Sequence, residues 1–179
     1  MTKYTAYLKT QTWDRRMEDL GEKIEELLAD ETSHEDTADK LDVQRIQQGI
    51  AEGDCLTVLM SKLHEMSELS GKNPAKEYMK YIMGYAELIG KFTINKKCEI
   101  NLMKVMLEYI MEDPDLEKAF MPTVQGLYDH EMNIISEEAV VEWLANAKKM
   151  EDEDFTPYIN YMQPFVDWLE EASEDEDEE

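Results

Sequence analysis

Two segments near the C-terminus place aromatic side chains among closely spaced carboxylates. The first contains Tyr128, Asp129, Glu131, Glu137, Glu138 and Trp143. The second contains Phe165, Trp168, Glu170, Glu171, Glu174, Asp175, Glu176 and Asp177. Side chains of these types can bind a flexible cationic segment, because carboxylates pair with lysine ammonium groups while aromatic faces accommodate the lysine stems. An exposed ion pair contributes only about 0.2–1 kcal/mol, so such a surface needs many acids.

Each tryptophan has a structural interpretation as well as a functional one. Trp143 shares a helical face with Val140 and Leu144, a spacing that favours core packing over partner contact. Trp168 follows Phe165 by three residues, so part of its ring is expected to be buried. The acids from Glu170 onward have no structural role that the sequence reveals, and they are the strongest candidates for partner contacts.

Five lysines in the middle of the chain are candidates for a basic face: Lys72, Lys76, Lys80, Lys96 and Lys97. They could form one patch or merely solvate two helices, and the sequence does not distinguish these alternatives. Ser173, in the run Ser-Glu-Asp-Glu, is typical of a site for an acid-directed kinase. Its phosphorylation would add about 1.5–2 negative charges to the second segment.

Catalytic and metal-binding patterns are scarce. His34, His64 and His130 are far apart in the sequence, and none has another ligand-type residue at a spacing that suggests zinc. No glycine-rich phosphate loop or nucleophile elbow is present. Cys55 and Cys98 are predicted to be buried apolar residues, since no neighbouring base would activate them. The sequence therefore predicts a binding protein without a metal or cofactor, and not an enzyme.

Length and charge narrow the function further. The 179 residues suit one domain, and 18 basic against 42 acidic side chains give a net charge of −24. This charge disfavours direct binding to nucleic acid. No stretch approaches eighteen consecutive apolar residues. We therefore expect a soluble, reduced, intracellular monomer with no membrane contact.

The elements that position these residues are predicted to be helices almost everywhere, because apolar residues recur at helical spacing. About eight helices are expected, in a stack of antiparallel pairs. They cover 13–28, the region from Leu41 through Val43 to Ile46, 54–69, 76–91, 97–111, 116–127 with a bend at Pro122, a segment opening at Ser136, and 154–171. We expect a flexible N-terminus over 1–12, a folded domain over 13–171 and a disordered acidic tail over 172–179.

The two aromatic and acidic segments resemble the boxes that end the two-tryptophan HEAT domain of translation factors. The matching runs are 128–131 with 134–143, and 163–172 continuing into 173–177. This domain closes eukaryotic translation initiation factor 5, the epsilon subunit of the exchange factor for initiation factor 2, and the factor-5 mimic proteins. The run 38–43, leading into 56–59, is similar to the start of the factor 5 domain.

The resemblance implies an all-α, HEAT-type fold and a scaffolding role in the cytoplasm. The acidic boxes would bind lysine-rich segments of the beta subunit of initiation factor 2. A basic face would contact initiation factor 1, the c subunit of initiation factor 3 and, as a further partner, initiation factor 4G. The alternative is a guanine-nucleotide exchange module for initiation factor 2, as in the epsilon subunit. GTPase activation is not expected, because the zinc ribbon of factor 5 needs more cysteines than two.

Overall fold

The computed structural model describes residues 12–30, 32–150 and 152–176, the last four by their backbone alone. Every regular element in these ranges is helical. The α-helices are α2 (Trp13–Ala29), α3 (His34–Gln48), α4 (Glu52–Met66), α5 (Pro74–Gly84), α6 (Ala86–Phe92), α7 (Lys96–Met111), α8 (Phe120–Tyr128), α9 (Glu137–Lys149) and α10 (Thr156–Glu176). Two short 3₁₀ helices, η1 (Pro114–Ala119) and η2 (Glu153–Phe155), precede α8 and α10. The prediction of an all-α protein is confirmed.

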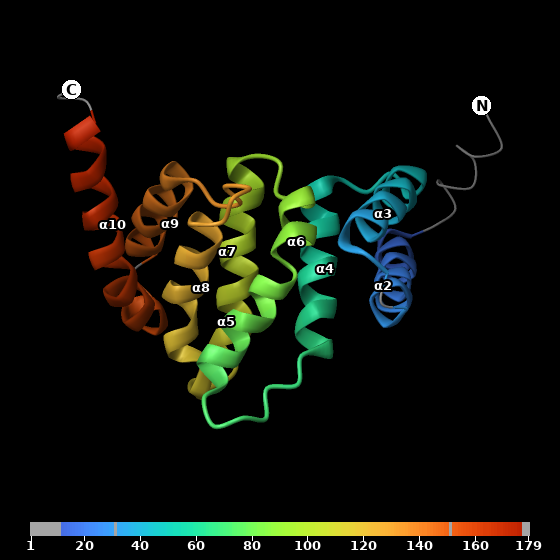
Figure 1. Cartoon of the computed structure of the whole chain (residues 1–179), viewed down its shortest axis with the longest axis horizontal. Helices are drawn as coiled ribbons and strands as arrows, with labels where there is room; N and C mark the ends of the chain where they lie inside the picture. Colours follow the sequence, from blue (N-terminus) through green and yellow to red (C-terminus); the bar gives the residue numbers. More distant parts are fainter. Residues whose placement is uncertain (1–11, 31, 151, 177–179) are drawn as a thin grey trace.

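The helices form two layers that alternate along the chain. Helices α2, α4, α7 and α9 pack side by side in one layer, while α3, α6, α5, α8 and α10 form the other. Helices also pack across the layers, as α2 does on α3, α4 on α6, α7 on α8 and α9 on α10. Figure 1 shows the result as an elongated stack, with α2 and α3 at one end and α10 at the other. The predicted N-terminal and C-terminal regions of the domain are therefore far apart.

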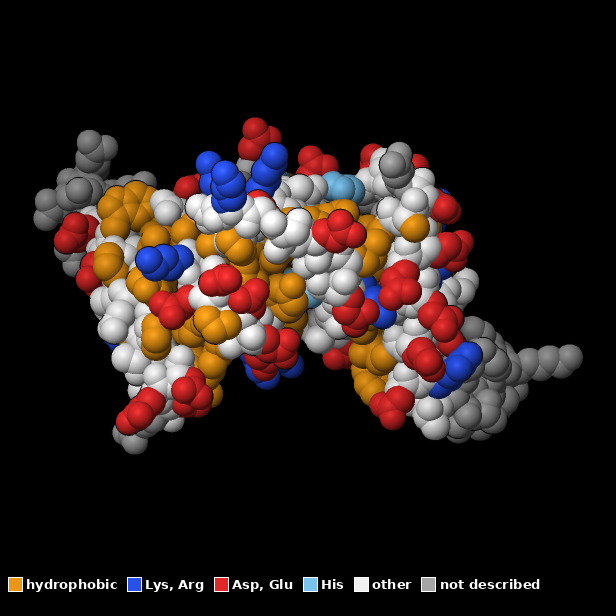
Figure 2. Space-filling model, turned by 90° about the horizontal axis from the view of Figure 1, so that it is seen from below, with side chains coloured by type: hydrophobic (Ala, Val, Ile, Leu, Met, Phe, Trp, Pro, Cys, Tyr) orange, Lys and Arg blue, Asp and Glu red, His pale blue; other side chains and the backbone are white. Residues whose placement is uncertain are grey.

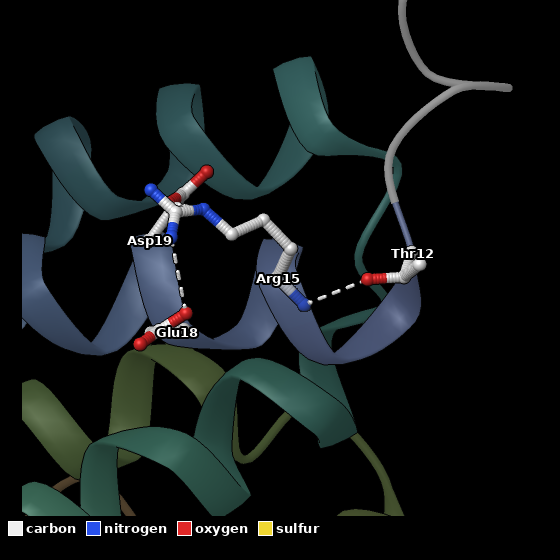
Figure 3. A network of polar contacts seen from close by, with 4 residues as sticks. All are labelled: Thr12, Arg15, Glu18 and Asp19. Atoms are coloured by element: carbon white, nitrogen blue, oxygen red, sulfur yellow. Dashed lines mark hydrogen bonds and ion pairs between the residues drawn. The ribbon is translucent and has the colours of Figure 1, made fainter.

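Side-chain caps fix where several helices begin. Thr12 caps α2, since its Oγ1 accepts a hydrogen bond from the Arg15 backbone N–H at 3.4 Å. The Arg15 guanidinium then pairs with Glu18 at 3.3 Å and Asp19 at 3.0 Å on the outer face of the same helix (Figure 3). Ser136 likewise caps α9, at the position where the sequence predicts a helix start.

The core runs the length of the stack between the two layers, and Tyr78, Phe92 and Phe120 are among its largest fully buried side chains. Val43 and Ile46 fall outside it, with 55% and 58% of their surfaces exposed. The periodic pattern groups them with Leu41, but α3 lies at the end of the stack, where no further helix in the described part of the chain covers its outer face.

Two predicted helices are divided in the structure. The segment 76–91 is broken at Tyr85 into α5 and α6, which raises the number of α-helices in the described residues to nine. The segment 116–127 is not one helix bent at Pro122, because η1 ends at Ala119 and α8 begins at Phe120. Pro122 then lies in the first turn of α8, where its missing N–H costs no intrahelical hydrogen bond.

The last helix extends beyond its predicted end. α10 runs to Glu176, whereas the pattern of apolar residues predicts an end near Glu171. Across the ranges that the structure describes, no helix combines the length and the apolar character needed to cross a bilayer.

Candidate partner-binding site

Three aromatic side chains follow one face of α10 at helical spacing. Phe165 is buried against α8, while Trp168 exposes 51% of its surface. The two rings stack with their centroids 6.0 Å apart and their planes 12° from parallel. Tyr161 lies one turn before Phe165 and is also exposed. Trp168 is thus supported on one side and open to solvent on the other.

A shallow groove of about 520 Å³ runs between α8 and α10 beside these rings. It is lined by Met121, Gln125, Asn160, Tyr161, Pro164, Phe165 and Trp168. Pro164 has no N–H to donate to the carbonyl of Asn160, so α10 lacks that one intrahelical hydrogen bond beside the groove. Figure 2, a view of the lower side of the stack, shows hydrophobic side chains exposed at this C-terminal end with acidic side chains beside them.

Carboxylates surround the exposed rings. The Tyr161 hydroxyl donates to Glu117 Oε1 at 2.8 Å, and this hydrogen bond raises the pKa of Tyr161. Asp167, Glu170 and Glu171 are exposed on α10. Glu171 lies three residues after Trp168 and hence on the same helix face. We call Glu117, Tyr161, Asp167, Trp168, Glu170 and Glu171 the acidic–aromatic surface.

The end of α10 concentrates negative charge. Its last turn carries no basic residue, although the helix dipole favours cations there. The side chains of Ser173, Glu174, Asp175 and Glu176, and the whole of Asp177, lie outside the described part of the structure, so their predicted roles stay predictions.

The structure brings the first predicted segment against the second. Tyr128, at the end of α8, meets Phe165 edge-on with ring centroids 5.7 Å apart. Asp129 and Glu131 follow in the exposed α8–α9 connection. Figure 1 shows this connection and the C-terminal end of α10 at the same, upper, end of the stack. Acids from both segments therefore contribute to the negative electrostatic potential at the upper end of the stack.

A carboxylate of α7 fixes the start of α9. Glu99 Oε2 accepts hydrogen bonds from the Ser136 backbone N–H at 2.8 Å and from the Ser136 hydroxyl at 2.5 Å. The first turn of α9 then presents Glu137, which is half-buried, and Glu138, which is exposed.

Residues 98–179 match a family described as "W2: eIF4-gamma/eIF5/eIF2-epsilon". This part of the chain is a W2 domain. It begins in α7 and holds α8, α9, α10 and all the acids of both segments, and its helices form part of a HEAT-like stack. The predicted resemblance to the two-tryptophan domain is confirmed.

Relatives extend the similarity beyond the W2 domain. The chain is 22% identical to eIF5-mimic protein 2 of Gallus gallus over 177 residues, which is 98% of this chain and 41% of that protein. It is 28% identical to eIF5-mimic protein 1 of Homo sapiens over 105 residues, or 59% of this chain and 24% of that protein. The epsilon subunit of eIF2B of Dictyostelium discoideum is 29% identical over 132 residues, or 69% of this chain and 18% of the subunit. The chain thus spans less than half the length of each relative.

The two tryptophans of the W2 domain occupy different environments. Trp143 is only 5% exposed, and its ring packs on Phe120 with the centroids 4.9 Å apart. Trp143 therefore contributes to the core, and Phe165 supports Trp168 from below. Of the four aromatic residues predicted to contact a partner, Trp168 alone is mostly accessible in the described structure.

The structure does not gather the five predicted lysines into one patch. Lys72 precedes α5, and Lys76 and Lys80 lie along it; Lys96 and Lys97 begin α7. Figure 1 shows the connection into α5 at the lower end of the stack and the connection into α7 at the upper end. A helix of the length of α7 spans about 24 Å, so Lys72 and Lys96 are well separated. Basic side chains gather near the middle of the lower side in Figure 2.

Lys96 belongs to the acidic end of the molecule instead. Its ammonium nitrogen lies 2.6 Å from Glu142 Oε2 on α9. This contact, with the nearby charges of Glu138 and Glu99, raises the pKa of Lys96. Lys96 thus joins α7 to α9, the helix that carries Glu137, Glu138 and Trp143 of the first segment.

Two kinds of reactive site considered from the sequence, a metal site and a reactive thiol, can be compared with the described residues. No group of three or more metal-ligating side chains lies together in them. Both cysteines are buried, and burial raises the pKa of Cys55 to about 12, so that thiol stays protonated at neutral pH.

The site residues predicted from the sequence omit seven members of the groove and the acidic–aromatic surface: Glu117, Met121, Gln125, Asn160, Tyr161, Pro164 and Asp167. Tyr161 could have been found, because it precedes Phe165 by four residues and Trp168 by seven. Glu117, Met121 and Gln125 come from η1 and α8, and only the packing of α8 on α10 brings them to the site.

Proposed function

We propose that this chain is a translation initiation scaffold that binds lysine-rich segments of the beta subunit of initiation factor 2 through the acidic–aromatic surface. The observation that carries the proposal is the half-exposed Trp168, stacked on Phe165, with exposed carboxylates on the same helix. A lysine ammonium over such a ring gains a cation–π attraction, and its stem covers apolar surface. The membership in the W2 family and the eIF5-mimic relatives support the same assignment.

The charge at the end of α10 also favours a cationic partner. Glu170 and Glu171 are exposed carboxylates, and no basic residue lies in the last turn of α10 to offset the negative charge there. A bound lysine-rich segment would supply the missing positive charge. Because a screening length of about 10 Å at 0.1 M salt exceeds the spacing of neighbouring side chains, these acids act together on the segment.

The remaining partners follow from the resemblance. We propose contacts with initiation factor 1, the c subunit of initiation factor 3 and initiation factor 4G, with Lys72, Lys76 and Lys80 as the basic face. The scaffold would act in the cytoplasm as a monomer, without enzymatic activity and without direct contact to membrane or nucleic acid.

Replacing Trp168 with alanine tests the proposal. The affinity for a fluorescent oligolysine peptide, measured by anisotropy, is expected to fall about two- to thirtyfold, which corresponds to a cation–π contact of about 0.5–2 kcal/mol. The double variant Glu170→Gln/Glu171→Gln should also weaken binding and reduce its dependence on sodium chloride.

Matched substitutions at the opposite end of the stack serve as controls. Trp13→Ala removes a tryptophan that is 43% exposed on α2, and Asp14→Asn/Glu22→Gln removes two exposed carboxylates from the same helix. Both should bind the peptide as the unaltered chain does. Equal losses of affinity from the variants at the two ends would show that binding is not specific to the acidic–aromatic surface and would refute the assignment of that surface.

The second candidate function is guanine-nucleotide exchange, favoured by the similarity to the epsilon subunit of Dictyostelium discoideum. Release of labelled GDP from initiation factor 2 separates the two functions. Accelerated release in the presence of this chain would support exchange, whereas unchanged or slowed release would support the scaffold.

A further inference from the structure

A second groove, of about 620 Å³, lies far from α10, beside α5. We call it the α5 groove. One wall is the exposed face of α5 and the residue after it, from Glu77 through Tyr81 and Gly84 to Tyr85. His34 at the start of α3 and Glu68 in the α4–α5 connection form the rest of its rim. Lys80, which also lines the groove, belongs to the proposed basic face, and the proposed function uses no other residue of the lining.

Aromatic rings line this groove in sequence. Tyr81 meets Tyr85 edge-on at 5.2 Å, and Tyr85 meets His34 at 5.5 Å with planes tilted by 33°. The Tyr81 hydroxyl donates to the carbonyl oxygen of Leu63 at 2.9 Å, which fixes this ring against α4. The three rings are half-buried, so each keeps part of its surface toward the groove.

Gly84 leaves the wall open between the rings. A Cβ atom built at Gly84 meets no heavy atom within 4 Å apart from its two chain neighbours and the backbone of its own helix, so no other part of the protein fills the space above this residue. Glu77 and Tyr85 are eight residues apart, which corresponds to a groove of about 12 Å along the helix. An extended peptide of about four residues covers this length.

The charges at the rim favour a cationic ligand. Glu68 is exposed, and Glu77 accepts a hydrogen bond from the Gly71 backbone N–H at 3.0 Å, which anchors the α4–α5 connection. Lys80 is the basic residue of the lining. Glu35 in the first turn of α3, next to His34, adds another carboxylate on that side. Aromatic faces beside carboxylates are the surroundings that arginine and lysine side chains prefer.

We propose that the α5 groove binds a short extended peptide segment of a partner and places an arginine or lysine side chain against Tyr85 and Glu68. Tyr81 and His34 would pack against the residues on either side. The groove would be a second peptide-binding site, independent of the acidic–aromatic surface, and the proposal does not depend on the proposed function.

Titration of the ¹⁵N-labelled chain with an acetylated Pro-Arg-Pro peptide tests this proposal. The prolines favour an extended peptide and reduce the entropy lost on binding. Amide resonances of Gly84, Tyr85 and Leu69 should shift, while that of Trp168 should not. The same peptide with citrulline, which keeps the shape of arginine without its charge, should bind at least about fivefold more weakly.

Two substitutions at Gly84 separate a filled groove from a damaged fold. Gly84→Gln projects a side chain into the groove without meeting the protein, so it should weaken peptide binding at least about fivefold at an unchanged or raised melting temperature. Gly84→Ala adds only a methyl group and should leave binding within about twofold. Glu68→Gln should reduce the preference for arginine over citrulline, while the contact with Tyr85 keeps part of it.

Equal binding of the arginine and citrulline peptides would overturn the proposal, as would shifts centred on α10 or full binding by Gly84→Gln. The oligolysine test uses Trp168, which is remote from this groove. A failure of either proposal can therefore be recognised without reference to the other.

Discussion

Trp143→Ala is expected to destabilise the chain by about 3–5 kcal/mol, the usual range for loss of a buried large aromatic side chain. Trp143 is almost completely buried on α9, and its ring packs on Phe120, which in turn meets Tyr158 of α10 at 6.1 Å. These rings join α8, α9 and α10. Since domains of this size are stable by only about 5–15 kcal/mol, the loss would be a large fraction of the total. Urea unfolding followed by far-UV circular dichroism measures it.

The matched variant is Trp168→Ala. Its ring is half exposed, so its removal should cost about 1 kcal/mol or less. The expected pattern is therefore a reversal: Trp143→Ala lowers stability strongly, while Trp168→Ala lowers peptide affinity. Similar losses of stability in both variants would contradict the distinction that the structure draws between the two tryptophans.

The distinction between the tryptophans shows what local sequence can reveal. The pattern Val140, Trp143, Leu144 indicates a buried helix face, and Trp143 is indeed buried. The exposure of Trp168 depends on α10 being the last helix of the stack, with α8 and α9 packed on one side of it. Helical spacing identifies a face of a helix, but it does not show whether another element covers that face. Val43 and Ile46 illustrate the same limit at the other end.

Helix starts were more predictable than helix interiors. Ser136 and the pair Asn73-Pro74 have side chains or ring geometry that favour a helix start, and α9 and α5 begin there. The break at Tyr85 follows Gly84, a poor helix former, but apolar residues continue at helical spacing through Ile89, so the pattern predicts a single helix. Its cause is tertiary: the break lets α6 pack on α3 and α4, while α5 packs on α8.

The composition of the candidate site was predictable, but its assembly was not. Trp168, Glu170 and Glu171 are neighbours in the sequence and stay neighbours on α10. Glu117 reaches Tyr161 from 44 residues away, and this contact needs the complete fold. The lysines show the reverse case. Lys72 and Lys96 are closer in the sequence than Glu117 and Tyr161 are, but Lys72 precedes α5 at the lower end of the stack in Figure 1 and Lys96 begins α7 at the upper end.

His64 is the buried titratable group with the clearest consequence for stability. It lies near the end of α4 and is 7% exposed. Its ring stacks on Tyr109 with the centroids 4.0 Å apart, and its Nε2 is 3.0 Å from the Tyr78 hydroxyl. No carboxylate takes part in these contacts. Burial lowers the pKa of His64 from 6.5 to about 4, because the charged ring would lose its hydration.

The lowered pKa predicts a loss of stability in mild acid. Between pH 6.5 and 4 the unfolded chain protonates His64 while the folded chain does not, so protons favour unfolding. The contribution is fully present above about pH 6.5 and decreases as the pH falls toward 4. It amounts to about 3 kcal/mol, at about 1.4 kcal/mol for each pKa unit. Urea unfolding at a series of pH values measures the decrease.

The many carboxylates of this chain also titrate in this range, so the effect of His64 needs a reference variant. His64→Gln keeps a polar group opposite the Tyr78 hydroxyl but cannot be protonated. The free energy of unfolding of the unaltered chain, minus that of His64→Gln, should fall by about 3 kcal/mol between pH 7 and pH 4. If the free energies of unfolding of the two chains changed in parallel with pH, either the imidazole would be protonated in the folded chain or the contacts of His64 with Tyr78 of α5 and Tyr109 of α7 would open in acid and admit water. The difference between the profiles therefore measures the proton linkage of one buried ring, separate from that of the acidic surface.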